Sequence, residues 1–201
     1  KSNKIITGLG EILWDLLPES KKLGGAPTNF VYHIRQLGYD GQVVSAIGKD
    51  QLGDEILEWL EENNIDDRYI TQLEKYPTGQ VEVTLDEKGD PEYNIIEDVA
   101  WDYLPYSDKL EELARNSAAL CFGSLAQRNK RSRQTIQKFL EKTSPDCIKV
   151  FDVNLRQNYY SSELIRDNIK LSNVLKLNTD ELKEISDMLS IQGTEDQVLE
   201  K

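Results

Sequence analysis

The sequence predicts an α/β fold in which helices flank a mostly parallel β-sheet. Short apolar runs, typical of buried strands, alternate along the chain with helical periods of about a dozen residues. With 201 residues, of which 38% are hydrophobic and 30% charged, the chain suits one sizeable globular domain. Because strands joined through helices form right-handed βαβ units, we expect most strands to be parallel.

The first third of the chain opens this pattern. Pro27 lies near the start of the first helical period and Gly38 lies just past its end, which is the usual placing of these residues around a helix. The next helical period carries an apolar stripe that includes Ile56 and Leu60. The pattern predicts strands at residues 5–9, 12–17 and 43–47, and helices at residues 27–37 and 53–62.

A β-hairpin is predicted near the middle of the chain, at about residues 79–97. Apolar and polar residues alternate strictly over 79–86, as in Val81-Glu82-Val83, and a second strand-like run follows at 92–97. Between them the Glu87-Lys88-Gly89-Asp90 segment is typical of a turn. The hairpin interrupts the α/β pattern, so it could form a lid or an edge of the sheet.

The second half of the chain returns to alternating helices and strands. The pattern predicts helices at residues 107–116, 131–142, 163–171 and 179–189, and strands at residues 118–122, 148–153 and 173–177. Ligands of parallel α/β sheets bind beyond the carboxyl ends of the strands. Candidate functional residues are therefore those that follow each strand.

Composition excludes several classes of function. A net charge of −12 argues against a nucleic-acid partner, which would need a basic face. No apolar run approaches the ~18 residues of a membrane helix, and no signal peptide is visible, so we expect a cytoplasmic protein without a membrane partner. Cys121 and Cys147 are expected to be buried reduced thiols. His33 is the only histidine, which excludes a histidine-rich metal site, and within its predicted helix it is expected to be packed or partly exposed rather than catalytic.

Two candidates lie near the start of the chain. The Gly24-Gly25-Ala26-Pro27-Thr28-Asn29 segment opens a helix, where glycines permit close approach of a ligand and Asn29 can both donate and accept hydrogen bonds. The segment could equally be an ordinary glycine-rich loop. Asp15 follows a strand-like run, and its carboxylate could accept bonds from two hydroxyls or could simply be solvated.

Two further candidates follow strands in the second half. Asp152, Asn154 and Arg156 alternate after an apolar strand, and Arg156 is suited to phosphate, although a polar surface loop is the other interpretation. Asn178 and Glu181 have the spacing of a capping box, so they could simply begin a helix. The functional alternative places Glu181 near a hydrated magnesium ion and Lys176 near a phosphate.

Six segments, taken in order, resemble the ribokinase-like (PfkB) sugar kinases over residues 5–190. No Walker P-loop or G-x-G-x-x-G fingerprint is present, which weakens the alternative of another nucleotide-binding α/β protein. The Gly-Gly-Ala-Pro-x-Asn form of the second segment is more similar to fructokinases than to ribokinases. The segments are residues 10–15 (GEILWD), 23–30 (LGGAPTNF), 48–53 (GKDQLG), 122–128 (FGSLAQR), 152–156 (DVNLR) and 176–181 (KLNTDE).

This resemblance implies a ribokinase-like fold and ATP-dependent transfer of a phosphoryl group to a primary hydroxyl of a furanose-like sugar, most closely fructose. It implies ATP and Mg²⁺ as cofactors, with K⁺ as an optional ion. The hairpin would be a lid that closes over the sugar and pairs with a second copy in a homodimer. By resemblance, the sugar-binding residues are Asp15, Gly24, Gly25, Asn29, Asn154 and Arg156.

The resemblance also implies roles nearer the phosphates. Arg156 would be catalytic, facing the sugar or the transferred group, and Lys176 would lie near the nucleotide phosphates. Asn178 and Glu181 would order the water shell of magnesium, with Glu181 acting through water.

One part of the family pattern is missing from the sequence. The family completes its site with a Gly-Ala-Gly-Asp type segment that carries an anion hole and the catalytic base, whereas here Gly193 is the only glycine after Gly123. We therefore expect a partial fold without its C-terminal third, inactive as a kinase on its own. A ribokinase or a 2-keto-3-deoxygluconate kinase is the alternative in the same class, and a non-catalytic sugar-binding protein is the alternative outside it.

Overall fold

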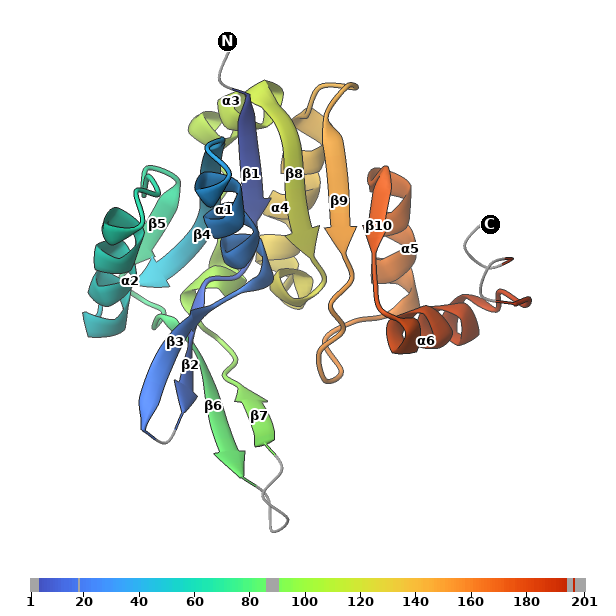
Figure 1. Cartoon of the computed structure of the whole chain (residues 1–201), viewed down its shortest axis with the longest axis horizontal. Helices are drawn as coiled ribbons and strands as arrows, with labels where there is room; N and C mark the ends of the chain where they lie inside the picture. The colour runs from blue at the N-terminus through green and yellow to red at the C-terminus, as the bar shows by residue number, and fades with distance from the viewer. Residues whose placement is uncertain (1–3, 18, 86–90, 195–196, 198–201) are drawn as a thin grey trace.

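A computed structural model describes residues 4–17, 19–85, 91–194 and 197 of the chain. These residues form a six-stranded sheet, in the order β10-β9-β8-β1-β4-β5, and a four-stranded sheet, in the order β3-β2-β6-β7. Every strand pair of the larger sheet is parallel, which confirms the predicted α/β fold. The smaller sheet projects beyond the ends of β1, β4, β8 and β9 (Figure 1).

The central strands of the larger sheet are its most apolar. In β4 every residue from Gly41 to Gly48 is buried, because helices cover both faces of the sheet at this position. The short β5 extends one edge of the sheet beside β4. The strands are β1 (Ile5–Leu9), β4 (Asp40–Gly48), β5 (Ile70–Leu73), β8 (Ser117–Gly123), β9 (Ile148–Asp152) and β10 (Val174–Lys176).

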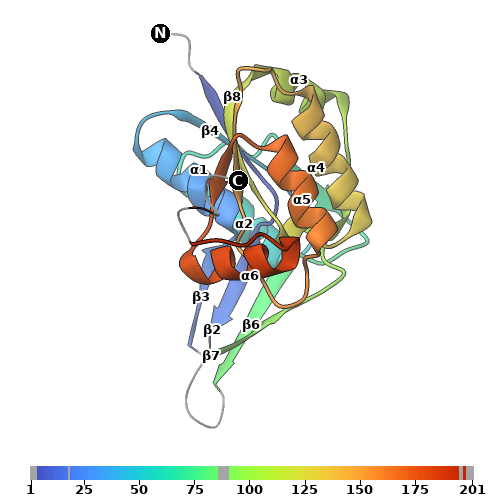
Figure 2. The ribbon, with the colours of Figure 1, turned by 90° about the vertical axis from the view of Figure 1, so that its right-hand side faces the viewer.

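Helices lie on the two faces of this sheet, with α1 and α2 on one face and α3, α4 and α5 on the other (Figure 2). Several begin with a side chain that accepts a bond from a backbone amide of the first turn, as Ser107 does in α3 and Ser161 in α5. The helices are α1 (Ala26–Gln36), α2 (Gln51–Glu62), α3 (Asp108–Asn116), α4 (Lys130–Lys142), α5 (Ser162–Leu171) and α6 (Thr179–Leu189), with the 3₁₀ turns η1 (Ala100–Tyr103) and η2 (Leu125–Gln127).

The smaller sheet, which we call the lid sheet, contains the predicted hairpin and two further strands. β6 (Gly79–Leu85) and β7 (Pro91–Ile95) pair antiparallel, as expected, while the turn predicted at 87–90 lies outside the described residues. On the other side β6 pairs in parallel with β2 (Leu13–Leu17), which is itself paired with β3 (Ser20–Gly24). The hairpin is therefore half of a four-stranded sheet that the N-terminal segment completes.

The apolar core lies mainly between the larger sheet and helices α3, α4 and α5. Its largest fully buried side chains are Trp101, Phe122, Phe139 and Phe151, and the rings of Phe122 and Phe151 stack at 5.2 Å. Both cysteines are buried free thiols, as predicted. Within the described residues, no helix combines the length and apolar character that crossing a membrane requires.

Candidate active site

A cavity of about 1040 Å³ lies between the carboxyl ends of the central strands and the lid sheet. Its floor comes from residues that follow or end β1, β8, β9 and β10, and one wall comes from the lid strands and the start of α1. This is the edge at which parallel α/β sheets bind ligands. The polar and charged residues of the lining are Glu11, Asp15, Asn29, His33, Asp152, Asn154, Arg156, Gln157 and Lys176.

Most of the predicted site residues meet in this cavity. Asp15, Gly24, Gly25 and Asn29 reach it from the N-terminal segments, and Asn154, Arg156 and Lys176 reach it from the ends of β9 and β10. Asn178 and Glu181 are not part of the lining. His33 lies on the cavity wall with its ring edge-on to Tyr32 at 5.4 Å.

The glycine-rich loop is shaped by close contacts with the segment after β1. Gly25 is the N-cap of α1 with a φ of 108°, and a Cβ there would lie 2.3 Å from the carbonyl oxygen of Glu11. A Cβ on Gly24 would lie 2.6 Å from Oδ2 of Asp15. Position 25 therefore requires glycine, whereas a side chain on Gly24 would have to displace the Asp15 carboxylate; the loop brings the exposed Asn29 to the same wall as Asp15.

Two carboxyl groups differ sharply in their surroundings. Asp15 is half-buried; burial raises its pKa, and the charge of Arg156 opposes that rise. Glu11 is only 1% exposed, its Oε1 accepts a bond from the Ala26 amide at 3.2 Å, and its Oε2 has no partner. Burial, with a smaller contribution from the charge of Asp152, raises the pKa of Glu11 to about 7.

Sequence reasoning assigned no role to Glu11, although the residue lies within the quoted Gly-Glu-Ile-Leu-Trp-Asp segment. The available signal was its position directly after the strand that the pattern placed at residues 5–9. Nothing in the local sequence indicates that the carboxylate is buried, because the start of α1, distant in the chain, covers it.

The loop between β9 and α5 carries Asn154 and Arg156 to the cavity. Asn154 (φ 42°) and Gln157 (φ 47°) both have left-handed backbones, which is uncommon outside glycine. The exposed Arg156 donates from Nη1 to the Leu155 carbonyl at 2.9 Å. The loop thus bends sharply on either side of Arg156.

Lys176 is paired across neighbouring strands. Its Nζ lies 2.9 Å from Oδ1 of Asp152, and this bond raises the pKa of the lysine. The lysine side chain remains 67% exposed, whereas the Asp152 side chain is 12% exposed. Asp152 therefore holds the ammonium group of a lysine whose side chain still reaches solvent.

Asn178 and Glu181 form the capping box that the sequence predicted as one alternative. Oδ1 of Asn178 accepts from the Glu181 amide, and Oε2 of Glu181 accepts from the Asn178 amide, both at 2.9 Å. Oε1 of Glu181 accepts from the Leu155 amide at 2.9 Å, which ties α6 to the β9–α5 loop. Within the described residues, no group of three or more His, Cys, Asp or Glu side chains is placed to hold a metal ion.

The predicted segment at 122–128 also serves local structure. Ser124 donates to the Val153 carbonyl at 2.7 Å, and Gln127 donates to the Gly123 carbonyl at 2.9 Å. Arg128, the last residue of the segment, is buried against Asp102. Within this segment, Leu125 lines the cavity. Cys121, which lies just before the segment, lines it as well.

Residues 19–201 match the pfkB family of carbohydrate kinases. Among curated relatives, an uncharacterized sugar kinase of Pyrococcus horikoshii is 29% identical over 196 residues, which cover 89% of this chain and 63% of the relative. An ATP-dependent 6-phosphofructokinase of Thermoanaerobacterium thermosaccharolyticum is 28% identical over 171 residues, covering 82% of this chain and 52% of that protein.

A fructokinase of Salmonella typhimurium is 26% identical over 190 residues, covering 89% of this chain and 61% of that protein. The solved structure of the Pyrococcus horikoshii sugar kinase in complex with ATP matches with a TM-score of 0.79 at 27% identity, over 91% of this chain and 66% of that one. The chain thus spans between 52% and 63% of the length of these three curated relatives.

Proposed function

The chain belongs to the pfkB family of carbohydrate kinases, and from this premise we propose that its cavity binds the acceptor sugar of an ATP-dependent phosphoryl transfer, with fructose as the sugar. One observation carries the proposal. Hydroxyl-binding groups from the start of the chain, Asp15 and Asn29, share a cavity with Arg156 from the end of β9. Such a cavity can hold a polyhydroxy ligand against a group suited to a phosphoryl anion.

In this proposal the N-terminal residues bind and orient the sugar. The Asp15 carboxylate accepts bonds from two neighbouring hydroxyls, and the Asn29 amide both donates and accepts. Because Gly25 has no side chain, the sugar can approach the start of α1 closely. Holding the acceptor hydroxyl in one place is a large part of what catalysis of phosphoryl transfer requires.

Arg156 reaches the acceptor from the loop after β9. Its guanidinium orients the acceptor or stabilises the charge of the transferred group, and Asn154 contributes a further contact to sugar hydroxyls. ATP, when bound, supplies the phosphoryl group. The roles of Lys176 at its phosphates, and of Asn178 and Glu181 in ordering water around Mg²⁺, stay predictions.

The oxygen atoms of the predicted magnesium residue Glu181 give only limited support for a magnesium site. Each oxygen of Glu181 already accepts a backbone amide, so this carboxylate fits an indirect contact through water better than direct ligation. We therefore assign no step to the metal. Pairing of lids between two copies and a cytoplasmic location also stay predictions.

A sugar phosphate is a second candidate acceptor, because one relative is a 6-phosphofructokinase at 28% identity. The charge of the lining favours the neutral sugar. The carboxyl groups of Glu11, Asp15 and Asp152 line the cavity, against the cations Arg156 and Lys176. Lys176 is paired with Asp152, and burial raises the pKa of Glu11 to about 7, so Asp15 is the carboxylate that disfavours an anionic acceptor near the start of α1.

Calorimetric titration of this chain tests the proposal. Fructose, fructose 6-phosphate, ribose and 2-keto-3-deoxygluconate are compared with the unmodified chain, with Asp15→Asn and with Glu58→Gln, an exposed acid on α2 that serves as the control. We expect fructose to bind most tightly, and Asp15→Asn to weaken it about 10- to 100-fold through lost charge-assisted hydrogen bonds. Equal fructose binding by Asp15→Asn and the control would refute the site, and tighter binding of fructose 6-phosphate would replace the sugar.

A further inference from the structure

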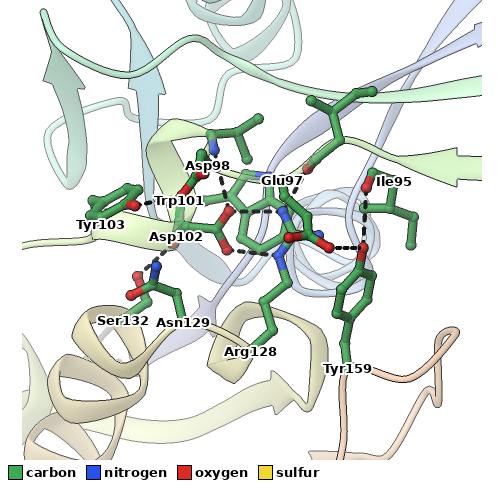
Figure 3. Close-up of polar contacts among 12 residues, drawn as sticks. Ile95, Glu97, Asp98, Trp101, Asp102, Tyr103, Arg128, Asn129, Ser132 and Tyr159 are labelled. Carbon is green, nitrogen blue, oxygen red and sulfur yellow. Dashed lines mark hydrogen bonds and ion pairs between the residues drawn. The ribbon is translucent and has the colours of Figure 1, made fainter.

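A buried guanidinium lies where the lid sheet joins the rest of the molecule. The Arg128 side chain is 6% exposed and its partner Asp102 is 2% exposed. Nε and Nη2 of Arg128 each donate to one oxygen of Asp102 at 2.8 Å, a two-pronged contact. The guanidinium also lies 4.1 Å from the ring centre of Trp101 and 4.7 Å from that of Tyr159 (Figure 3).

On one side this pair holds the segment that returns from the lid. Nη2 of Arg128 donates to the Ile96 carbonyl at 2.6 Å. Oδ2 of Asp102 accepts from the Val99 amide at 3.2 Å. Both backbone groups lie between the end of β7 and the start of η1, so the exit of the lid strand is tied to Arg128.

On the other side Arg128 meets the β9–α5 loop. The Tyr159 ring packs on the guanidinium, and its hydroxyl donates to Oε1 of Glu97 at 2.8 Å (Figure 3). Nε2 of Gln157 donates to the Tyr93 carbonyl of β7 at 2.9 Å. The loop that carries Arg156 is therefore bonded directly to the lid strand.

The loop needs such support, because its backbone is strained. Asn154 and Gln157 are both left-handed, and for glutamine, which adopts this conformation much less readily than asparagine, it persists only where the surroundings impose it. The lid strand that supplies the contacts also lines the cavity through Tyr93 and Ile95. One strand thus lines the cavity proposed for the acceptor and also contacts the loop that presents Arg156.

We propose that Arg128 is a positioning residue that couples the lid to the β9–α5 loop, so that β7 settling on an acceptor orders Asn154 and Arg156 against the same acceptor. The coupling to an acceptor rests on the proposed function, whereas the mechanical link between the two segments does not. A buried ion pair adds little stability compared with apolar packing, so the contacts to Ile96 and Tyr159 account better for a charge at this position.

Hydrogen–deuterium exchange of the full chain without ligand tests the link. Arg128→Lys keeps the charge but loses the two-pronged contact, and Tyr159→Phe keeps the ring but loses the hydroxyl. Tyr160→Phe is the matched control, because the hydroxyl of the adjacent tyrosine bonds Glu184 on α6 instead of the lid. We expect residues 93–98 and 153–161 to exchange about 2- to 10-fold faster, and together, in both variants.

Two readouts of this experiment separate positioning from mere stability. The buried β8 (Ser117–Gly123) should keep its exchange rate in Tyr159→Phe, and the control, which loses a contact to α6 and none to the lid, should leave residues 93–98 unchanged. Faster exchange in only one segment, in neither, or equally in β8 would overturn the proposal. Arg128→Lys could weaken the whole fold, and Tyr159→Phe, at a half-buried position, then decides the matter.

A second arm adds saturating fructose. In the unmodified chain we expect slower exchange at residues 24–29 and at 153–161. In Tyr159→Phe the protection of 24–29 should remain while that of 153–161 is lost, with fructose affinity reduced about 2- to 10-fold. Retained protection of both regions would overturn the coupling. If the unmodified chain binds no sugar, the proposed function fails and the ligand-free arm still decides the link.

Discussion

Replacing Glu11 by Gln should change how the stability of the protein depends on pH. The carboxyl group is buried at the floor of the cavity with one unpartnered oxygen, and its pKa is raised from 4.5 to about 7. Gln has the same shape and can still accept the bond from the Ala26 amide, but it has no proton to lose in this pH range. The comparison therefore isolates the ionisation of a single group.

The sign follows from which state holds the proton. Between pH 4.5 and about 7 the folded chain keeps Glu11 protonated while the unfolded chain has lost the proton. The free energy of unfolding therefore falls as pH rises through this window and levels off above it. At about 1.4 kcal/mol per pH unit, the full effect is about 3 kcal/mol, of which about 2 kcal/mol falls between pH 5.5 and 8.5.

Urea unfolding at several pH values between 5.5 and 8.5 measures this effect, in a range that avoids the isoelectric point near 4.6. The quantity of interest is the difference in free energy of unfolding between the unmodified chain and Glu11→Gln, because other groups then cancel. The exposed Glu58→Gln serves as the control and should give a difference that does not vary with pH. A difference for Glu11→Gln that is equally flat would show that the carboxyl group is ionised normally.

Three further changes probe other parts of the site. Gly25→Ala should lower the free energy of unfolding by at least about 1–3 kcal/mol and abolish sugar binding, because the new Cβ meets the Glu11 carbonyl. Urea unfolding measures the first effect and calorimetry with fructose the second, and unchanged binding would contradict the close contact. Glu181→Ala should cost about 2 kcal/mol by urea unfolding, because it removes the acceptor of the Asn178 amide in the capping box of α6 and the acceptor of the Leu155 amide. A loss below about 0.5 kcal/mol would argue against both bonds. Burial raises the pKa of Cys121 to about 12, so its thiol should react with a disulfide reagent only after unfolding. Rapid labelling of Cys121 in the native chain, identified by mass spectrometry, would be inconsistent with this burial.

Much of the larger sheet could be predicted, because its strands are short apolar runs between helices with clear boundaries. Strands β3 and β5 were not predicted. The β3 segment, Ser-Lys-Lys-Leu-Gly, has three exposed residues and no apolar alternation, and it is extended only because it pairs with β2. The β5 segment is short and half polar, and it is extended because it pairs with the edge of β4. In both strands, tertiary pairing determines what local propensity leaves open.

The residues of the candidate site also divide into those with a local sequence signature and those whose role depends on tertiary structure. Asp15 and Asn29 could be selected because they lie in a strand-like run and near the start of a helix, which carry local signatures, although Asp15 lies within β2 of the lid sheet and not at a strand end as expected. The pairing of Lys176 with Asp152 could not, since it depends on β10 lying beside β9 in one register, with these two residues opposite each other. Burial of Glu11 likewise depends on a helix start that lies fifteen residues further along the chain.

The two interpretations that the sequence left open for Glu181, a helix cap or a site residue, are compatible in the structure. One carboxylate oxygen completes the capping box of α6 while the other accepts the Leu155 amide, next to Arg156. The β9–α5 loop is thus held from α6 by Glu181 and from the lid strand by Gln157. Because two distant elements both fix this short strained segment, the position of Arg156 depends on the lid and on α6 together, and a change at either one should be felt at the proposed acceptor site.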